Sequence, residues 1–206
     1  METIKQEEQT EPRAPAGDEV NWGRFVLDIF ETLILAVVLF LGINAVSARV
    51  RVDGFSMRPT LEDGEFVLVN KLSYRFAEVE RGDIIVFHFP MNPREELIKR
   101  VIGLPGEHLK LLDNHYYING VLLQEPYLAT DLYTYNGSYL REGAEITIPN
   151  NQYFVSGDNR PRSSDSREWG PIDKSSIIGR SQLRYFPFDR FGLISEVGYP
   201  NLPNSK

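Results

Sequence analysis

The chain of 206 residues contains no cysteine, which excludes disulfide bridges, thiolate metal ligands and a cysteine nucleophile. Its three histidines, His88, His108 and His115, do not have the spacing of a metal-binding motif. We therefore expect no metal and no other cofactor. Acidic residues outnumber basic ones, and the net charge of −7 argues against nucleic acid as a partner, because such binding depends on Lys and Arg contacts to phosphates.

Apolar residues are scarce in the first part of the chain and dominate the next. Residues 1–21 are polar, acidic and proline-containing, so they cannot bury enough apolar surface to offset their ordering entropy. We expect a disordered tail there. Between Thr32 and Ala48 there is no charged residue. Extended back to Phe25, a helix rising about 1.5 Å per residue reaches the thickness of a hydrocarbon core of about 30 Å.

Two other interpretations of the apolar segment remain open. A buried helix of a soluble protein would need a larger protein around it. A cleavable signal peptide would explain the small residues Val46-Ser47-Ala48, but such peptides begin with a short positive region, and this one follows an acidic tail. An uncleaved anchor over 22–48 is preferred. Basic residues on its two sides leave the orientation open: Arg13 and Arg24 before it, and Arg49, Arg51 and Arg58 after it.

Residues 49–206 read as short strands separated by turns, with few helical periods. Steps such as Asn119-Gly120 and Pro105-Gly106 are typical of tight turns and hairpins. This pattern predicts a mostly β domain, an antiparallel sandwich or barrel, with a small excursion near residues 112–145. Strands are expected at residues 50–52, 65–69, 83–89, 97–102, 115–118, 145–148, 152–155 and 177–185.

Ser56 follows the alternating run Val50-Arg51-Val52 and lies between Gly54 and Pro59, which punctuate a turn. Its hydroxyl is therefore expected at the edge of a sheet. A serine hydroxyl is a poor nucleophile without a base, and none of the three histidines lies in a motif that suggests one. A turn serine that hydrogen-bonds its own backbone is the alternative.

Lys99 is the better candidate for a base. In a strand over 97–102 it shares a face with Leu97 and Val101, whereas Arg100 points to the other face. An amine on an apolar face loses hydration of its charged form, so its pKa falls and it can accept a proton from a serine. Ser–Lys pairs are an alternative to histidine-based triads. A lysine that extends to water is the competing interpretation.

A polar segment over residues 156–167 completes the set of candidates. It holds two aspartates, three arginines and several serines, so we expect a loop. Asp165 and Arg167 could pair and fix its shape, and a serine hydroxyl could hold the amine of Lys99. The alternative is a solvated surface loop, although loops on a rigid sheet commonly carry sites.

Taken in order, these segments resemble bacterial type I signal peptidases, the membrane-anchored serine proteases that remove signal peptides from exported proteins. The resemblance extends from about residue 25 to about 185. It is carried by the anchor and by four segments: Ser56-Met57-Arg58-Pro59-Thr60-Leu61, residues 81–87, residues 98–107, and Gly157-Asp158-Asn159 through Gly170.

The resemblance implies a role for several residues. Ser56 matches the nucleophile, with its backbone N–H as an oxyanion donor, and Lys99 matches the general base. Ser163 matches the serine that orients the lysine. Asp165 and Arg167 match a supporting ion pair, with Asp158 nearby. Gly54 departs from members that have a serine there as a second oxyanion donor, so that donor must come from elsewhere.

The family's fold is mostly antiparallel β sheet closing into a barrel-like shape. Its members are anchored in the bacterial plasma membrane or the thylakoid membrane, and their catalytic domain lies outside the cytoplasm. The resemblance therefore implies an N-terminus in the cytoplasm and a catalytic domain over residues 49–206 on the other side of the membrane. Its partners are signal peptides of secreted preproteins and the lipid bilayer. The oligomeric state is left open.

Signal peptides end in small residues of the Ala-x-Ala type, and reading them requires shallow apolar pockets beside an extended strand. Val50, Val52, Leu97 and Ile98 are candidate pocket walls, and all four are equally suitable as core residues. Two other functions remain to be weighed. One is a self-cleaving regulator of the repressor type, which the anchor and the absence of a DNA-binding segment oppose. The other is a tethered, noncatalytic β domain that binds peptides or glycans.

Overall fold

The computed structural model describes residues 22–129, 132–199 and 201–202, so the expected disordered tail over 1–21 lies outside the described residues. The chain divides into two compact units between Gly42 and Ile43. This division lies inside helix α1 (Trp22–Val46) rather than at residue 48, because the last helical residues contact the β unit. Lys71 donates from its backbone N–H to the carbonyl oxygen of Val46 at 3.0 Å and from Nζ to that of Asn44 at 3.3 Å.

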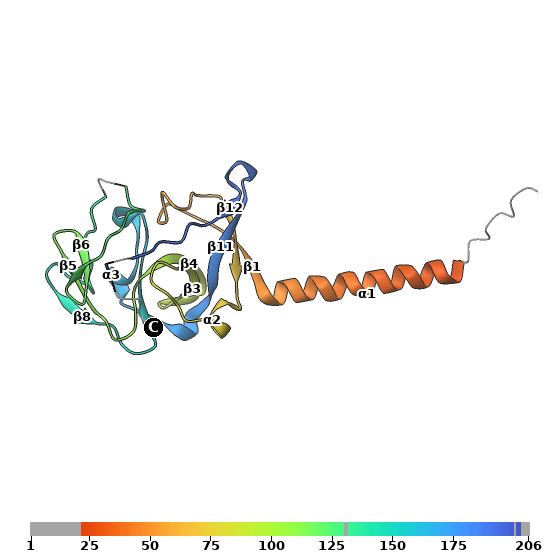
Figure 1. Ribbon diagram of the computed structural model, residues 1–206, viewed down its shortest axis with the longest axis horizontal. Coiled ribbons are helices and arrows are strands. Elements are labelled where there is room, and N and C mark those ends of the chain that lie inside the picture. The colour runs from red at the N-terminus through yellow and green to blue at the C-terminus, as the bar shows by residue number, and fades with distance from the viewer. Residues whose placement is uncertain (1–21, 130–131, 200, 203–206) are drawn as a thin grey trace, which may run out of the picture. The chain divides into compact units, whose positions relative to one another are not determined.

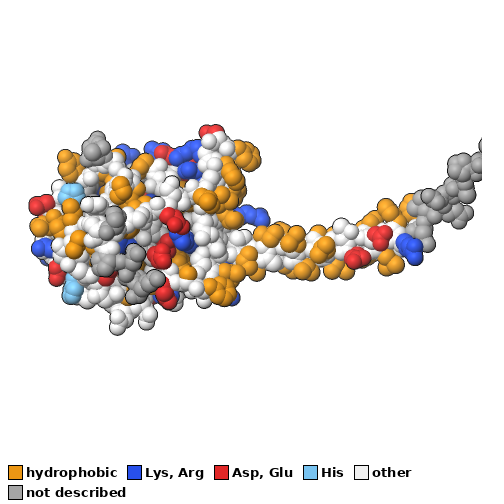
Figure 2. All heavy atoms as spheres, in the orientation of Figure 1, with side chains coloured by type: hydrophobic (Ala, Val, Ile, Leu, Met, Phe, Trp, Pro, Cys, Tyr) orange, Lys and Arg blue, Asp and Glu red, His pale blue; other side chains and the backbone are white. Residues whose placement is uncertain are grey.

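Helix α1 is long and apolar enough to cross a membrane. It contains no proline, and apolar side chains occur around its whole circumference, so no face is reserved for packing against a protein core. None of its residues is buried, and Figure 2 shows apolar side chains along its visible face. The helix ends two residues earlier than the expected segment 22–48, and Ser47 and Ala48 instead begin strand β1 (Ser47–Arg51).

The β unit is built from two antiparallel sheets (Figure 1). The large sheet has the order β1-β2-β11-β3-β4-β9-β10, with β12 paired to β11, and the small sheet has the order β7-β6-β5-β8. The mostly β, antiparallel fold expected from the sequence is confirmed. After β1, the elements are β2 (Phe66–Asn70), α2 (Ser73–Phe76), β3 (Ile84–Phe89), β4 (Asn92–Gly103), β5 (His108–Leu112), β6 (His115–Ile118), β7 (Val121–Leu122), β8 (Glu145–Thr147), β9 (Gln152–Ser156), η1 (Arg160–Arg162), α3 (Ser166–Trp169), β10 (Ile172–Asp173), η2 (Lys174–Ser176), β11 (Ile177–Phe186), η3 (Phe188–Arg190) and β12 (Gly192–Leu193).

Each of the eight expected strand segments overlaps a strand of the structure, but β5, β7, β10 and β12 were not predicted. Three of them are only two residues long, too short for a period to appear in the sequence. β5 alternates buried residues with more accessible ones, but it begins two residues after the expected turn Pro105-Gly106 and contains Lys110, so the sequence pattern did not reveal it. The expected excursion near 112–145 corresponds to β6, β7 and the segment that connects β7 to β8.

The two faces of β3 and β4 bury different side chains. On one face, Ile84, Val86 and Ile98 pack with the residues around Ser56. On the other, Ile85, Phe87 and Val101 pack with β9, β10 and Leu104. Alternation along β4 therefore places Lys99 on the second face and Arg100 on the first.

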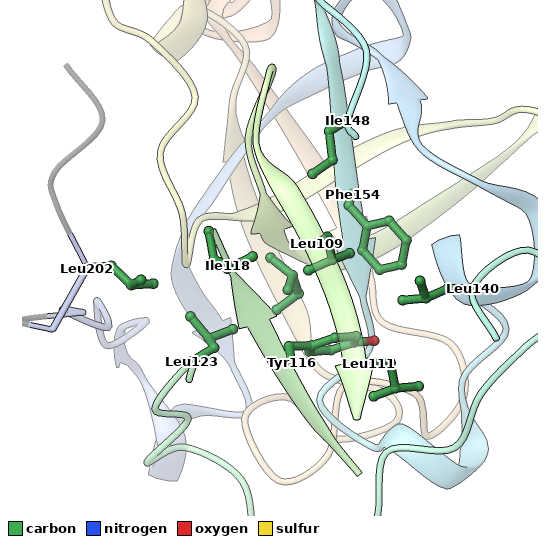
Figure 3. Packing of buried hydrophobic residues seen from close by; sticks show 10 residues of the cluster. Leu109, Leu111, Tyr116, Ile118, Leu123, Leu140, Ile148, Phe154 and Leu202 are labelled. Atoms are coloured by element: carbon green, nitrogen blue, oxygen red, sulfur yellow. The ribbon is translucent and has the colours of Figure 1, made fainter. Parts of the chain in front are cut away.

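The small sheet closes a third apolar cluster, shown in Figure 3. Leu109, Leu111 and Tyr116 from β5 and β6 pack against Phe154 of β9, whose ring meets that of Tyr116 edge-on at 6.0 Å between centroids. Full burial of such side chains stabilises the fold by about 1.5–3 kcal/mol each. This cluster fixes β9, and the loop that follows β9 carries several of the candidate residues.

Candidate active site

Ser56 lies in a tight turn that backbone hydrogen bonds hold on both sides. Met57 and Leu61 are buried, and the N–H of Leu61 donates to the carbonyl oxygen of Met57 at 2.9 Å. Upstream, the N–H of Val52 donates to the carbonyl oxygen of Glu65 at 2.7 Å. The turn is therefore fixed on both sides, while Ser56 itself stays half-buried.

Gly54 has a φ of +93°, a region that side chains disfavour. Its N–H donates to Oδ1 of Asp63 at 2.8 Å, which holds the bend before Ser56. A Cβ added at this position would meet no heavy atom within 4 Å. Glycine is thus required here by the backbone conformation, not by lack of space.

Lys99 projects from β4 toward this turn. Its Nζ lies 2.8 Å from Oγ of Ser56, and only 4% of the residue is exposed. The expectation that it might extend to water is wrong for this lysine, since the rigid strand pairing with β3 directs the amine to the serine.

The pKa of the Lys99 amine is lowered from its usual 10.5 to about 8. Burial is the largest cause, because the interior disfavours the charged ammonium. Asp165 and then Asp158 oppose this by attracting the cation, Arg167 adds to the lowering, and Glu95 makes a smaller opposing contribution. An appreciable fraction of the amine is therefore neutral near pH 8.

The loop after β9 is held by Asp165. The carboxylate accepts hydrogen bonds from Nε and Nη2 of Arg167, both at 2.8 Å, and from the N–H of Gly157 at 3.0 Å. Burial alone would raise the pKa of Asp165, but the hydrogen bonds and the charge of Arg167 outweigh it, so the pKa is lowered. This loop is buried at its base and is not a solvated surface loop.

Asp158 forms a second buried pair on the same loop. Its two carboxylate oxygens accept from Nε and Nη2 of Arg100 at 2.8 and 2.7 Å, and Thr60 donates its hydroxyl to the same carboxylate. Arg100 also donates to the carbonyl oxygen of Gly82 at 2.8 Å. Because Thr60 belongs to the turn of Ser56, Asp158 links that turn to both β4 and the loop.

The hydroxyl of Ser163 makes no hydrogen bond of normal geometry among the described residues, but it lies close enough to Asp165 to help lower the pKa of that carboxyl. The Oγ of Ser163 is buried beside Gly157, where an added Cβ would come within 2.3 Å of it and within 2.5 Å of the carbonyl oxygen of Ser56. The structure therefore brings Ser163 close to the turn of Ser56, while the expected contact of its hydroxyl with the amine of Lys99 stays a prediction.

The candidate pocket residues separate into two groups. Val52 and Ile98 are buried in one cluster, and the half-buried Val50 packs against it. Leu97 instead packs against the cluster on the opposite face of β4.

Sequence reasoning missed three side chains of this site. The sequence analysis placed Arg100 on the face of its strand opposite to Lys99 but did not identify Asp158 as its partner. Arg160 and Glu125 form a buried ion pair that joins the loop to the excursion. The available signal was the position of Arg100 beside Lys99 and of Arg160 near Asp158. Local sequence pattern does not show which carboxylate far along the chain each arginine binds.

This arrangement supports one type of chemistry directly. A neutral amine beside a hydroxyl can take the hydroxyl proton as the oxygen attacks a carbonyl carbon. The buried ion pairs fix the positions of both groups.

Comparison with known proteins gives a single family. The family model described as "Signal peptidase, peptidase S26" matches residues 24–186. The chain is 38% identical over 200 residues to "Signal peptidase I" of Leptolyngbya laminosa, covering 93% of this chain and 94% of that protein. It is 34% identical over 195 residues to "Probable signal peptidase I-2" of Synechocystis, covering 91% and 84%. A crystal structure of a signal peptidase I from Enterococcus faecalis is 35% identical and covers 50% of this chain and 97% of that one, with a TM-score of 0.43.

Proposed function

Since the chain belongs to the signal peptidase family S26, we propose that it is a membrane-anchored endopeptidase that removes signal peptides with a Ser56 nucleophile and a Lys99 general base. The observation that carries this mechanism is the distance of 2.8 Å between Nζ of Lys99 and Oγ of Ser56. It is supported by the pKa of the amine, which burial lowers to about 8.

The reaction follows from this pair. Neutral Lys99 accepts the hydroxyl proton of Ser56 while Oγ forms a bond to the scissile carbonyl carbon. The resulting ammonium returns the proton to the leaving amine as the C–N bond breaks, leaving an acyl-enzyme. Water then attacks the ester, giving its proton to Lys99, and Oγ leaves with a proton. The backbone N–H of Ser56 is a donor for the oxyanion, and Ser163 orients the amine.

The substrate segment is an extended peptide ending in small residues of the Ala-x-Ala type. Val50, Val52 and Ile98 support this, because they belong to one apolar cluster that includes Met57 and Leu61 of the turn of Ser56. Leu97 packs in a different cluster, on the face of β4 that also carries Lys99, so it stands apart from the other three candidate pocket residues.

The anchor and the catalytic domain correspond to residues 22–48 and 49–206. The exposed apolar helix α1 supports a membrane span. Phe188 and Phe191, which are 80% and 61% exposed between β11 and β12, support a position of the catalytic domain beside lipid headgroups, since aromatic side chains favour that interface. The N-terminus is assigned to the cytoplasm and the β unit to the outside of a plasma or thylakoid membrane.

The test is cleavage of a preprotein with an Ala-x-Ala site, in detergent, by the wild type and by Ser56→Ala and Lys99→Ala. Lys174→Ala is the matched control, because that amine pairs with Glu78 and is partly exposed. We expect the wild type and the control to cut after the small residue and both active-site variants to be folded and inactive. Cleavage by Lys99→Ala would refute the dyad and leave the family fold with a different mechanism.

A noncatalytic peptide-binding domain is the alternative function. It predicts that the wild type binds the signal peptide without cutting it, and that Ser56→Ala binds equally well. The short Lys99–Ser56 distance argues for the enzyme, because a binding surface has no need of a buried amine.

A further inference from the structure

The segment between β7 and β8 carries two residues that reach the loop of Asp158 and Asp165. These are Glu125 and Tyr127, and with their partners Arg160 and Arg100 they form what we call the excursion clamp. The mechanism described above uses neither Glu125 nor Tyr127, and yet their contacts are buried.

Glu125 binds the guanidinium of Arg160 with both carboxylate oxygens. Oε2 accepts from Nη1 at 2.9 Å, and Oε1 accepts from Nη2. The side chain of Arg160 is fully buried, and that of Glu125 is 7% exposed. Nη1 also donates to the hydroxyl of Thr134 at 2.9 Å. A bidentate pair of this kind fixes the guanidinium in one orientation.

Arg160 transmits that orientation to the backbone beside Ser163. Its Nε donates to the carbonyl oxygen of Gly157 at 3.0 Å, and its own carbonyl oxygen accepts from Nη2 of Arg167 at 2.7 Å. Gly157 has no free space: an added Cβ would come within 2.5 Å of the carbonyl oxygen of Ser56. A shift of Arg160 would therefore displace Gly157, and with it Ser163 and the turn of Ser56.

Tyr127 connects the same clamp to β4. Its hydroxyl donates to Oε1 of Glu125 at 2.6 Å and accepts from Nη2 of Arg160 at 3.3 Å. The face of its ring lies 4.0 Å from the guanidinium carbon of Arg100, a cation–π contact. Arg100 holds Asp158 and neighbours Lys99 in the chain, so the clamp contacts arginines from both elements that carry the site.

We propose that Glu125 and Tyr127 are positioning residues, which set the loop of Ser163 and the Ser56 turn against Lys99 through Arg160 and Arg100. The proposal rests on the Ser56–Lys99 mechanism. A buried ion pair contributes little net stability over an apolar replacement, so the distinctive contribution of this one is the geometry that it imposes on Gly157.

The test compares Glu125→Gln with Glu142→Gln, a control from the same segment whose carboxylate accepts from the N–H of Asp113. We expect Glu125→Gln to lower kcat about tenfold or more at temperatures where it is fully folded, with KM within about twofold, because small misplacements of reacting groups cost rate more than binding. A looser site also returns the amine of Lys99 toward water, so the rise of kcat/KM with pH should move to higher pH. A purely structural role would lower the melting temperature and leave that pH profile in place.

Tyr127→Phe is the second variant, in case Glu125→Gln does not fold. It removes only the hydroxyl and keeps the ring on Arg100, and Tyr133→Phe, at an exposed tyrosine of the same segment, is its control. Loss of one hydrogen bond to a carboxylate predicts a fall in kcat of about fivefold. In a Ser163→Ala background this fall should shrink, since the two changes act on one set of atoms.

The possible failures are distinguishable. If the wild type cleaves, Lys99→Ala is inactive, and both clamp variants keep the wild-type kcat and pH profile, the clamp is overturned and the dyad stands. If Lys99→Ala still cleaves, the dyad fails and the clamp fails with it. Equal effects of Tyr127→Phe with and without Ser163 would also overturn the positioning role.

Discussion

The carbonyl oxygen of Ser56 accepts a hydrogen bond from the backbone N–H of Asn159 at 2.9 Å. The side-chain amide of Asn159 donates in addition to the carbonyl oxygen of Phe55 at 3.0 Å. These contacts join the turn of the proposed nucleophile to the loop that carries Asp158, Ser163 and Asp165. The turn and the loop therefore move together, and changes in either are expected to appear in catalysis.

The pH dependence of cleavage is expected to follow Lys99. The base must be neutral, and burial lowers the pKa of the amine to about 8, so kcat/KM should rise with pH through about 8 and level off above it. The measurement is kcat/KM between pH 6 and 10, with folding checked by circular dichroism at each pH. A profile that is flat between pH 6 and 9 contradicts Lys99 as the base.

Removing the buried amine is expected to stabilise the fold while abolishing activity. The folded pKa of about 8 lies below the unfolded value of 10.5, so the unfolded chain holds the proton more tightly and stability rises with pH across that window. Below about pH 8 the wild type bears the full cost, which at 1.36 kcal/mol per pH unit is about 3 kcal/mol. Lys99→Met should therefore be more stable near pH 7.

Urea denaturation at pH 7 and at pH 10.5 measures this effect. The advantage of Lys99→Met over the wild type should shrink at the higher pH, where both folded forms are neutral at this position. Lys174→Met is the control: the hydrogen bond to Glu78 raises the pKa of that amine, so the variant should show no gain in stability at pH 7. An equal advantage at both pH values would show that packing, not charge, causes it.

Ser163→Ala is expected to change rate more than stability. Its hydroxyl makes no hydrogen bond of normal geometry among the described residues and only a weak interaction with Asp165, so its loss should alter the free energy of unfolding by about 1 kcal/mol or less. If it orients Lys99, kcat should fall about tenfold or more.

Ser166→Ala is the matched control for that variant. Its Oγ accepts from the backbone N–H of Val155 at 3.0 Å, so its removal should cost about 1–3 kcal/mol and affect kcat less. The two serines thus have opposite expected profiles in unfolding and cleavage assays. A wild-type kcat for Ser163→Ala would remove it from the mechanism.

Gly157→Ala is expected to disturb the site directly. The new Cβ would come within 2.3 Å of Oγ of Ser163 and 2.5 Å of the carbonyl oxygen of Ser56, and the latter is backbone and cannot rotate away. A displacement of the nucleophile by about 1 Å predicts a loss of about 100-fold in kcat/KM. Gly192→Ala, where the added Cβ meets nothing within 4 Å, should cleave like the wild type. Similar rates for the two variants would refute this account.

Cleavage-site choice is expected to depend on the apolar cluster beside the Ser56 turn. Shortening Val50, Val52 or Ile98 to alanine opens space in the apolar cluster beside the Ser56 turn, so these variants should accept larger residues at the cleavage site. Leu97→Ala, at a residue that packs in a different cluster, should retain the wild-type choice. Mass spectrometry of a digested peptide library measures this. Unchanged choice in the Val50, Val52 and Ile98 variants would exclude these residues as pocket walls.

The sequence by itself determined the apolar helix, the antiparallel β class and the identity of Ser56 and Lys99 as a candidate pair. These follow from local pattern: an uncharged run of sufficient length, a period of two, and short segments that resemble a known family. The face of Lys99 was also predictable, because alternation along a strand fixes it relative to Leu97 and Arg100.

Only the tertiary structure decided which charged side chains meet. Arg100 with Asp158 and Arg160 with Glu125 join segments far apart in the chain, and each guanidinium is buried because its partner carboxylate is delivered by a different element. It also decided that Val50, Val52 and Ile98 share one cluster while Leu97 belongs to another. Sequence pattern reports which face of its own strand a residue occupies, whereas packing of distant strands and loops determines what lies opposite that face.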